Sequence, residues 1–257
     1  MPSVARLNVT PVKSTRLHHP VRIRLGLHGA EGDRAFFLVD GEGRRFSGPR
    51  AARVMAVRAE HDPDEGTLRF AFPDGTEVEG PAEATGPPLV ADFWGREVRA
   101  RIVPGPWEEA LSAFAGRPLR VARPDRAGDA VDVRPVTLVS LASVEDLARR
   151  GGADGRLDPG RFRMLIELEG CAPYEEDTWA GRLLAVGGAV IRADGPVPRC
   201  AVTTKDPQTG ETDFPTLEAI ERVRGRSAAG KLPFGIYADV VEPGEVTVGD
   251  PVHLIEA

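Results

Sequence analysis

The segment 198–204 (PRCAVTT) places a thiol beside a fixed positive charge, in a chain with only two cysteines. The thiolate is the form of cysteine that binds metals or attacks an electrophile, and the Arg199 guanidinium favours that form of Cys200. A soft thiolate suits a soft or redox-active metal. The alternative is a structural thiol that packs as a small hydrophobic group, which is our interpretation of Cys171. Cys200 is therefore a candidate metal ligand or reactive group.

Cationic and hydroxyl side chains also stand at the ends of expected strands. Lys13-Ser14 ends the first strand, Arg34 begins another, and Arg161 and Arg163 flank Phe162. Arginine holds phosphate or carboxylate in a fork of two hydrogen bonds. In a net acidic chain, converging cations would form a local anion site. The alternative is that each arginine is a solvated surface residue, weakly paired with one of the 39 acidic residues.

Several common motifs are absent from the sequence. There is no GxxxxGK[ST] loop, no GxGxxG between a strand and a helix, no HExxH and no GxSxG. Two cysteines exclude an iron–sulfur cluster held by four cysteines of this chain. We interpret the adjacent His18-His19 pair as solvated loop residues rather than a metal site.

Composition limits the classes of partner. The chain has 257 residues, of which 41% are hydrophobic and 28% charged, values typical of globular proteins. The net charge of −6 argues against a general binder of nucleic acid or anionic membranes. No apolar run approaches the roughly 20 residues of a membrane helix, and the N-terminus lacks the apolar core of a signal peptide. With no disulfide framework, we expect a cytoplasmic protein.

The elements that must position these residues are mainly short strands. Residues 34–40 form an apolar run, and residues 68–72 alternate between apolar and polar types before the turn signal Asp74-Gly75. A second hairpin is expected at Trp94-Gly95. Repeated short strands predict a barrel or sandwich for the first part of the chain.

The second part mixes strands and helices. Residues 107–114 have helical spacing and end before Gly116, and 123–134 is expected to be a surface connection. Further on we predict strands at 137–140, 161–168, 183–193, 234–241 and 246–255, a helix opening with a capping-box-like Ser143 and Asp146, and an amphipathic helix at 216–223. The sequence thus predicts a mostly β (α+β) fold with two domains, 1–122 and 123–257.

Seven segments together resemble MOSC-domain proteins with an N-terminal MOSC β-barrel domain, above all the mitochondrial amidoxime-reducing components and their bacterial relatives. They are TPVKS (10–14), EGDRAFFLVD (31–40), RPVTLVSLASVEDL (134–147), RFRMLIELEG (161–170), PYEEDTW (173–179), PRCAVTTKDPQTGE (198–211) and PFGIYADVVEPGEVTVGDPVHL (233–254). The resemblance runs over almost the full length and implies two consecutive β-barrels.

The resemblance also implies a molybdenum cofactor, in which a pterin dithiolene with a phosphate tail holds the metal. Cys200 matches the position of the protein's thiolate ligand to the metal. The positions matching the cofactor contacts are Lys13, Ser14 and Arg34 from the first barrel, and Ser140, Arg163, Arg199 and Thr203 from the second. After Phe-Arg the family usually has Pro-Asn, whereas this chain has Met164-Leu165, so we expect one amide contact to be missing.

By resemblance, the expected activity is reduction of N-hydroxylated compounds such as amidoximes and hydroxylamines. A separate electron donor, ferredoxin-like or cytochrome b5-like, is expected because no further domain follows Ala257. Asp206 could carry a proton, but we interpret it as a turn residue. Two alternatives stay open. Cys200 could serve a non-catalytic carrier of the cofactor or of sulfur, or the site could carry out a different transformation, because a fold does not fix a substrate.

Overall fold

A seven-stranded sheet forms most of the C-terminal half of the chain in the computed structural model, which describes residues 1–255. Its order is β1 (Ser3–Leu7), β12 (Ile166–Glu169), β11 (Val136–Ser140), β15 (Pro233–Glu242), β14 (Ala189–Pro198), β13 (Leu183–Val186) and β17 (Val252–Leu254). The sheet nearly closes, since the backbone N–H of Val252 donates to Pro2 and that of Val4 to Asp250, at 2.8 and 2.9 Å. Its enclosed side is a continuous core of aliphatic residues together with Trp179. This half is a barrel, as predicted.

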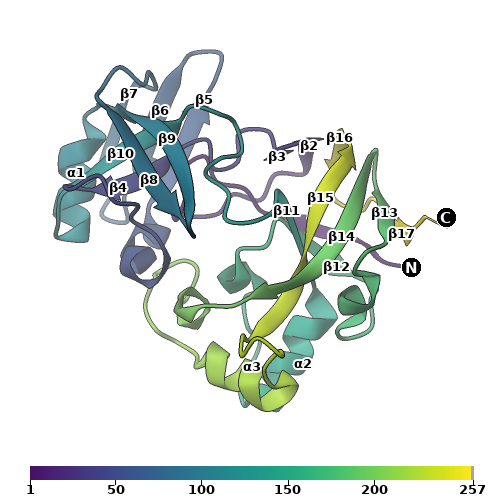
Figure 1. Cartoon of the computed structure of the whole chain (residues 1–257). Helices are drawn as coiled ribbons and strands as arrows, with labels where there is room; N and C mark the ends of the chain where they lie inside the picture. The colour runs from purple at the N-terminus through teal and green to yellow at the C-terminus, as the bar shows by residue number, and fades with distance from the viewer. Residues whose placement is uncertain (256–257) are drawn as a thin grey trace.

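The N-terminal half contains two smaller antiparallel sheets. One has the order β4 (Phe37–Asp40), β10 (Leu119–Pro124), β9 (Arg96–Val103) and β8 (Pro88–Phe93), and the other joins β5 (Arg58–Asp62), β6 (Thr67–Ala71) and β7 (Glu77–Pro81). The hairpins predicted at Asp74-Gly75 and Trp94-Gly95 are both present, between β6 and β7 and between β8 and β9. The two halves lie side by side (Figure 1).

The first strands of the chain belong to the sheets of the C-terminal half. β1 pairs with β12, and β2 (Arg22–Gly26) pairs with β16 (Gly244–Thr247) and β3 (Gly29–Ala30). Both termini accordingly lie beside the barrel of the C-terminal half (Figure 1). A division at residue 122 therefore describes the order along the sequence, whereas in space β1, β2 and β3 belong to the other half.

The helices lie close to their predicted positions. They are α1 (Trp107–Ala115), ended by a left-handed Gly116, α2 (Leu141–Gly151) and α3 (Thr216–Arg224). The capping-box prediction at Ser143 was wrong, because Ser140 is the N-cap and its hydroxyl accepts from the Ala142 N–H at 3.2 Å. Ser143 lies one turn further on and donates to the buried Glu176 instead. No helix within residues 1–255 is long and apolar enough to cross a membrane.

Two strand predictions were wrong at residues that matter for the site. The strand predicted at 161–168 begins only at Ile166, because Pro159–Phe162 forms a 3₁₀ turn and Arg163 is left-handed, with φ 51°. Asp158 caps this turn by accepting from the Gly160 N–H at 2.8 Å, and the buried Arg161 guanidinium pairs with Asp213 at 2.6 Å. Likewise β4 begins at Phe37, so Arg34 (φ 50°) lies in the preceding turn. Arg34 and Arg163 therefore lie in turns and not in strands.

Candidate functional site

A cleft of about 460 Å³ lies where the two halves meet, and residues from both line it. Six of the eight predicted site residues reach its wall: Lys13, Ser14, Arg34, Arg163, Arg199 and Cys200. Lys13 and Ser14 were expected at the end of the first strand. That strand stops at Leu7, and the two residues lie in the loop after it, where the Lys13 N–H donates to Phe36 at 2.8 Å. Loops from distant parts of the sequence thus converge on one space.

Ser140 and Thr203 do not line the cleft, and both are fully buried. Ser140 caps α2, and its backbone N–H donates to Glu176 at 3.2 Å. The Thr203 hydroxyl donates to the Cys200 carbonyl at 3.0 Å, which fixes the 3₁₀ turn Ala201–Thr204 behind the thiol. Thr203 thus holds the backbone of Cys200 in place without lining the cleft itself.

Cys200 follows β14 and is exposed. Its carbonyl accepts from both the N–H and the hydroxyl of Thr203, at 3.1 and 3.0 Å, while its thiol lies on the cleft wall. The other thiol is different: burial, together with Glu175 and Glu176, raises the pKa of Cys171 to about 11. Cys171 is therefore protonated and unreactive at neutral pH, as its structural interpretation requires.

Arg163 and Arg199 bring buried hydrogen-bond donors to the cleft. Arg163 donates through Nη2 to the Thr15 carbonyl at 2.7 Å, and Arg199 donates to Phe162 O and to Met164 Sδ. Burial lowers the pKa of Arg199, and burial with the charge of Arg34 lowers that of Arg163 to about 10. Yet Arg163 Nη1 and Arg199 Nε have no hydrogen-bond partner within residues 1–255. Such buried donors normally have an acceptor, so the cleft fits an anionic ligand rich in oxygen.

The remaining predicted cations have carboxylate partners. Lys13 Nζ lies 2.9 Å from Asp132 Oδ2, and Arg34 pairs with Asp33. Burial lowers the pKa of Lys13 to about 8 despite the attraction of Asp132. Burial alone would raise the Asp132 pKa, but the Lys13 charge and a hydrogen bond from Trp94 outweigh it and lower that pKa to about 2. Lys13 and Asp132 thus form an ion pair at neutral pH.

The backbone around the cleft is strained. Five residues other than glycine have positive φ within the part of the chain that the structure describes, and four of them line the cleft. These four are Ser14 (80°), Arg34 (50°), Trp94 (61°) and Arg163 (51°). Strain of this kind costs about 1–3 kcal/mol per residue and concentrates at functional sites. Its position supports this cleft as the functional site.

Sequence reasoning missed several lining residues, namely Arg45, Trp94, Asp132, Lys231 and Tyr237. Trp94 was seen only as part of a turn, and Asp132 only as part of a charged surface connection. Burial raises the pKa of Tyr237, which keeps its hydroxyl protonated. Among the lining residues in the described range 1–255, Asp132 is the only carboxylate, beside seven cationic side chains. The one signal in the sequence for these residues was the bulky Trp94 at the predicted Trp94-Gly95 turn, where a small or polar residue is usual.

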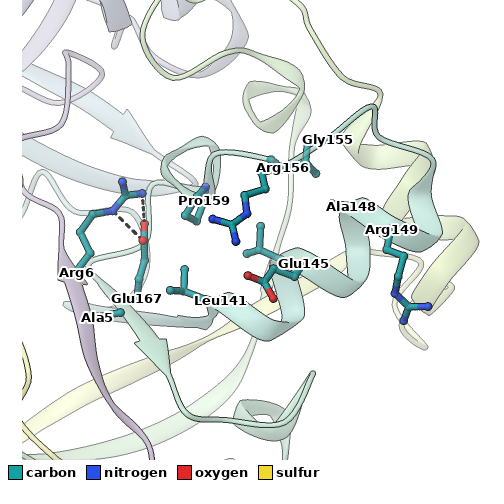
Figure 2. Close-up of a pocket in the computed structure, with 12 residues that line it drawn as sticks. Ala5, Arg6, Leu141, Glu145, Ala148, Arg149, Gly155, Arg156, Pro159 and Glu167 are labelled. Carbon is teal, nitrogen blue, oxygen red and sulfur yellow. Dashed lines mark hydrogen bonds and ion pairs between the residues drawn. The ribbon is translucent and has the colours of Figure 1, made fainter.

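A second pocket, of about 420 Å³, lies between β1, α2 and the loop before β12. Figure 2 shows Arg6 held by two hydrogen bonds to Glu167, each 2.8 Å long. The side chains of Glu145 and Arg156 point toward each other. None of its side chains within residues 1–255 carries a buried donor or acceptor that lacks a partner. This pocket therefore gives no sign of a polar ligand.

The other candidate groups have structural contacts. His18 Nε2 lies 2.7 Å from Ala59 O, and His19 Nδ1 lies 2.8 Å from Asn8 Oδ1. Asp206 accepts from the N–H groups of Gln208 and Thr209, at 2.9 and 2.8 Å, as a turn aspartate does. Over residues 1–255, no cluster of three or more His, Cys, Asp or Glu could hold a metal ion. Any metal in the cleft would need further ligands from a bound group.

Comparisons with known proteins agree with this fold. Residues 1–117 match the MOSC N-terminal beta barrel domain and residues 125–253 match the MOSC domain, so the chain belongs to the MOSC family. It is 28% identical to mitochondrial amidoxime-reducing component 1 of Mus musculus, over 98% of this chain and 82% of that protein. A molybdenum cofactor sulfurase of Caenorhabditis briggsae is 34% identical, over 58% of this chain but 21% of that protein.

Among solved structures, the YUAD protein of Bacillus subtilis has the same fold, with a TM-score of 0.50 and 17% sequence identity. The match covers 100% of this chain and 98% of that chain. Both halves of the molecule therefore have a counterpart in one solved structure.

Proposed function

We propose that the cleft binds a molybdenum cofactor and that the protein reduces N-hydroxylated compounds of the amidoxime or hydroxylamine type. One observation carries this proposal: an exposed thiol shares a cleft with buried arginine donors that lack partners within residues 1–255. A cofactor with a phosphate tail would supply acceptors to these donors, and its metal would need one soft ligand from the chain. The relatives named for amidoxime reduction and for the molybdenum cofactor support the same assignment.

Each residue has a distinct role in this proposal. Cys200 would be the metal ligand, supported from behind by Thr203. Arg163 and Arg199 would donate hydrogen bonds to the anionic part of the cofactor, from side chains fixed by bonds to Thr15, Phe162 and Met164. Lys13, Ser14 and Arg34 would bind it from the opposite half. A ligand held between both halves is shielded from water on two sides.

The metal centre, when bound, supplies two-electron redox chemistry. The overall change converts R–NH–OH, two electrons and two protons into R–NH₂ and water. The electrons come from a separate donor protein, and the protons come from solvent in the cleft. The task of the chain is to orient the substrate nitrogen and oxygen near Cys200 and to exclude bulk water.

A non-catalytic carrier of cofactor or sulfur is the second candidate function. The exposure of Cys200 favours it, because a persulfide or docking thiol must be reachable. In that case the purified protein would carry persulfide on Cys200 and no molybdenum.

Anaerobic turnover of benzamidoxime separates the two candidates. Protein with a verified molybdenum load, supplied with dithionite-reduced methyl viologen, should convert benzamidoxime to benzamidine. Cys200→Ala should abolish turnover, and Cys171→Ala, a matched change at the other thiol, should retain it. Fully loaded protein without turnover would overturn the reductase proposal.

A further inference from the structure

We propose that Trp94 is a stacking platform that selects planar, aromatic substrates at the mouth of the cleft. This inference rests on the proposed function, because it names the kind of substrate that the cleft would take. It is carried by the position, strain and hydrogen bonding of one exposed indole.

Trp94 occupies an unfavourable position with no packing reason. It stands in the turn between β8 and β9, where Trp94 (φ 61°) and Gly95 (φ 86°) are both left-handed. Asparagine, aspartate or glycine is the usual residue in such a turn, since a bulky side chain strains it. The indole is also 64% exposed, so it gains little from the core. A strained, exposed aromatic residue on the wall of a cleft points to a ligand.

The ring is nevertheless held in one orientation. Its Nε1–H donates to Asp132 Oδ1 at 2.9 Å, and the Arg45 guanidinium lies 4.7 Å from the ring centroid. Arg45 is itself fixed, because its Nε donates to the Asp92 carbonyl at 3.0 Å and its guanidinium also lies over Phe93. The bond from Trp94 to Asp132 connects the N-terminal half to the 125–135 connection. The exposed surface of the indole is thus preorganised for binding.

The neighbours of the indole indicate which ligand fits. A rigid exposed indole favours a flat apolar ring, by stacking. Asp132 is 45% exposed, so its carboxylate has room to accept a further N–H from the ligand. An aromatic ring carrying an amidine-like N–H group satisfies both features. Small aliphatic N-hydroxylated compounds have no ring to stack on the indole, so they would bind only to the Asp132 carboxylate.

Three variants test this proposal. Trp94→Asn removes the indole but supplies a residue that favours the turn, and Trp94→Phe keeps a ring without the N–H. Val90→Ala is the matched control, because Val90 is 57% exposed on the same hairpin but does not line the cleft. Each variant is compared with wild type in the loaded protein, by equilibrium binding of benzamidine and acetamidine and by kcat and KM for benzamidoxime and acetamidoxime.

Trp94→Asn should raise the benzamidine Kd and the benzamidoxime KM about tenfold, and the acetamidine Kd and acetamidoxime KM far less. Trp94→Phe should retain most of the affinity, and Val90→Ala all of it. Equal changes for the aromatic and aliphatic ligands, or no change for either, would overturn the proposal. The proposal would also be overturned if Trp94→Asn changed only the KM for an electron-donor protein, because the indole would then contact that protein and not the substrate. If wild type reduces neither substrate yet binds benzamidine in a Trp94-dependent way, the platform stands and the reductase proposal fails.

Discussion

At the scale of single residues, Asp132 connects the two halves of the cleft. Its carboxylate bonds to Lys13 and to Trp94, both from the N-terminal half, while Asp132 itself lies on the connection to the second half. Lys13 is almost fully buried, with 7% of its side chain exposed, so it needs a counter-charge even without ligand. Asp132 provides that charge.

Replacing Asp132 by Asn should weaken folding in a pH-dependent way. The folded pKa of about 2 lies below the ordinary 3.8, so the stabilisation is complete above pH 3.8 and is lost as the pH falls toward 2. Because the side chain is 45% exposed, we expect D132N to cost about 1 kcal/mol at pH 7. Urea unfolding of both proteins from pH 2 to 7 checks this.

Asp125→Asn, on an exposed residue of the same connection, is the control and should behave as wild type at every pH. A gap between D132N and wild type that persists undiminished at pH 2 would contradict the assignment of the ion pair.

Leu165 stands where the family resemblance implies an asparagine, so we predict that one amide contact to the cofactor is missing. The Leu165 side chain lies in the core of the barrel, 1% exposed, and Met164 lines the cleft. The Met164 sulfur accepts from Arg199 Nη1 at 3.3 Å, so the substitution helps to position a cleft arginine.

At the scale of elements, local signals predicted the hairpins and helices well. Asp74-Gly75 and Trp94-Gly95 needed only the alternation of their flanking strands, and α1 needed only its spacing and Gly116. The turn at Pro159–Phe162 has a local signal of its own, Asp158-Pro159-Gly160 with Asp158 as its cap. The pairing of the buried Arg161 with the distant Asp213 could not be predicted in this way. The convergence of six predicted site residues followed from the family resemblance rather than from local patterns.

Gly235 lies where β15 packs closely against Met164, a residue of the cleft wall. It is left-handed (φ 72°), and an added Cβ would lie 2.6 Å from Met164 Cε and 2.7 Å from Leu138 O. Gly235→Ala should therefore destabilise the fold by about 1–3 kcal/mol in chemical denaturation. Gly195→Ala on β14 is the matched control, since its Cβ would meet nothing within 4 Å, and it should be close to neutral. Equal stability of the two variants would show that the close packing around Gly235 is not rigid.

At the scale of the whole molecule, the cleft lies where the chain passes between its two halves, because its first strands belong to the C-terminal half. β1 and β2 pair with β12 and β16 of the C-terminal half before the chain builds the N-terminal sheets, so Lys13 and Arg34 lie on the crossing segments (Figure 1). The two consecutive β-rich regions could be predicted from strand patterns. The pairing of β1 and β2 with strands of the C-terminal half could not be predicted, because strands more than 150 residues apart in the sequence leave no local signal of their pairing.

The central claim is that Cys200 and the cleft cations hold a molybdenum cofactor. The most direct test is the molybdenum and pterin content of wild type, Cys200→Ala and Cys171→Ala, each purified from a host that makes the cofactor, with circular dichroism to verify folding. We predict stoichiometric molybdenum in wild type and Cys171→Ala, and its loss in folded Cys200→Ala. Wild type without molybdenum, or Cys200→Ala with a full load, would contradict the account.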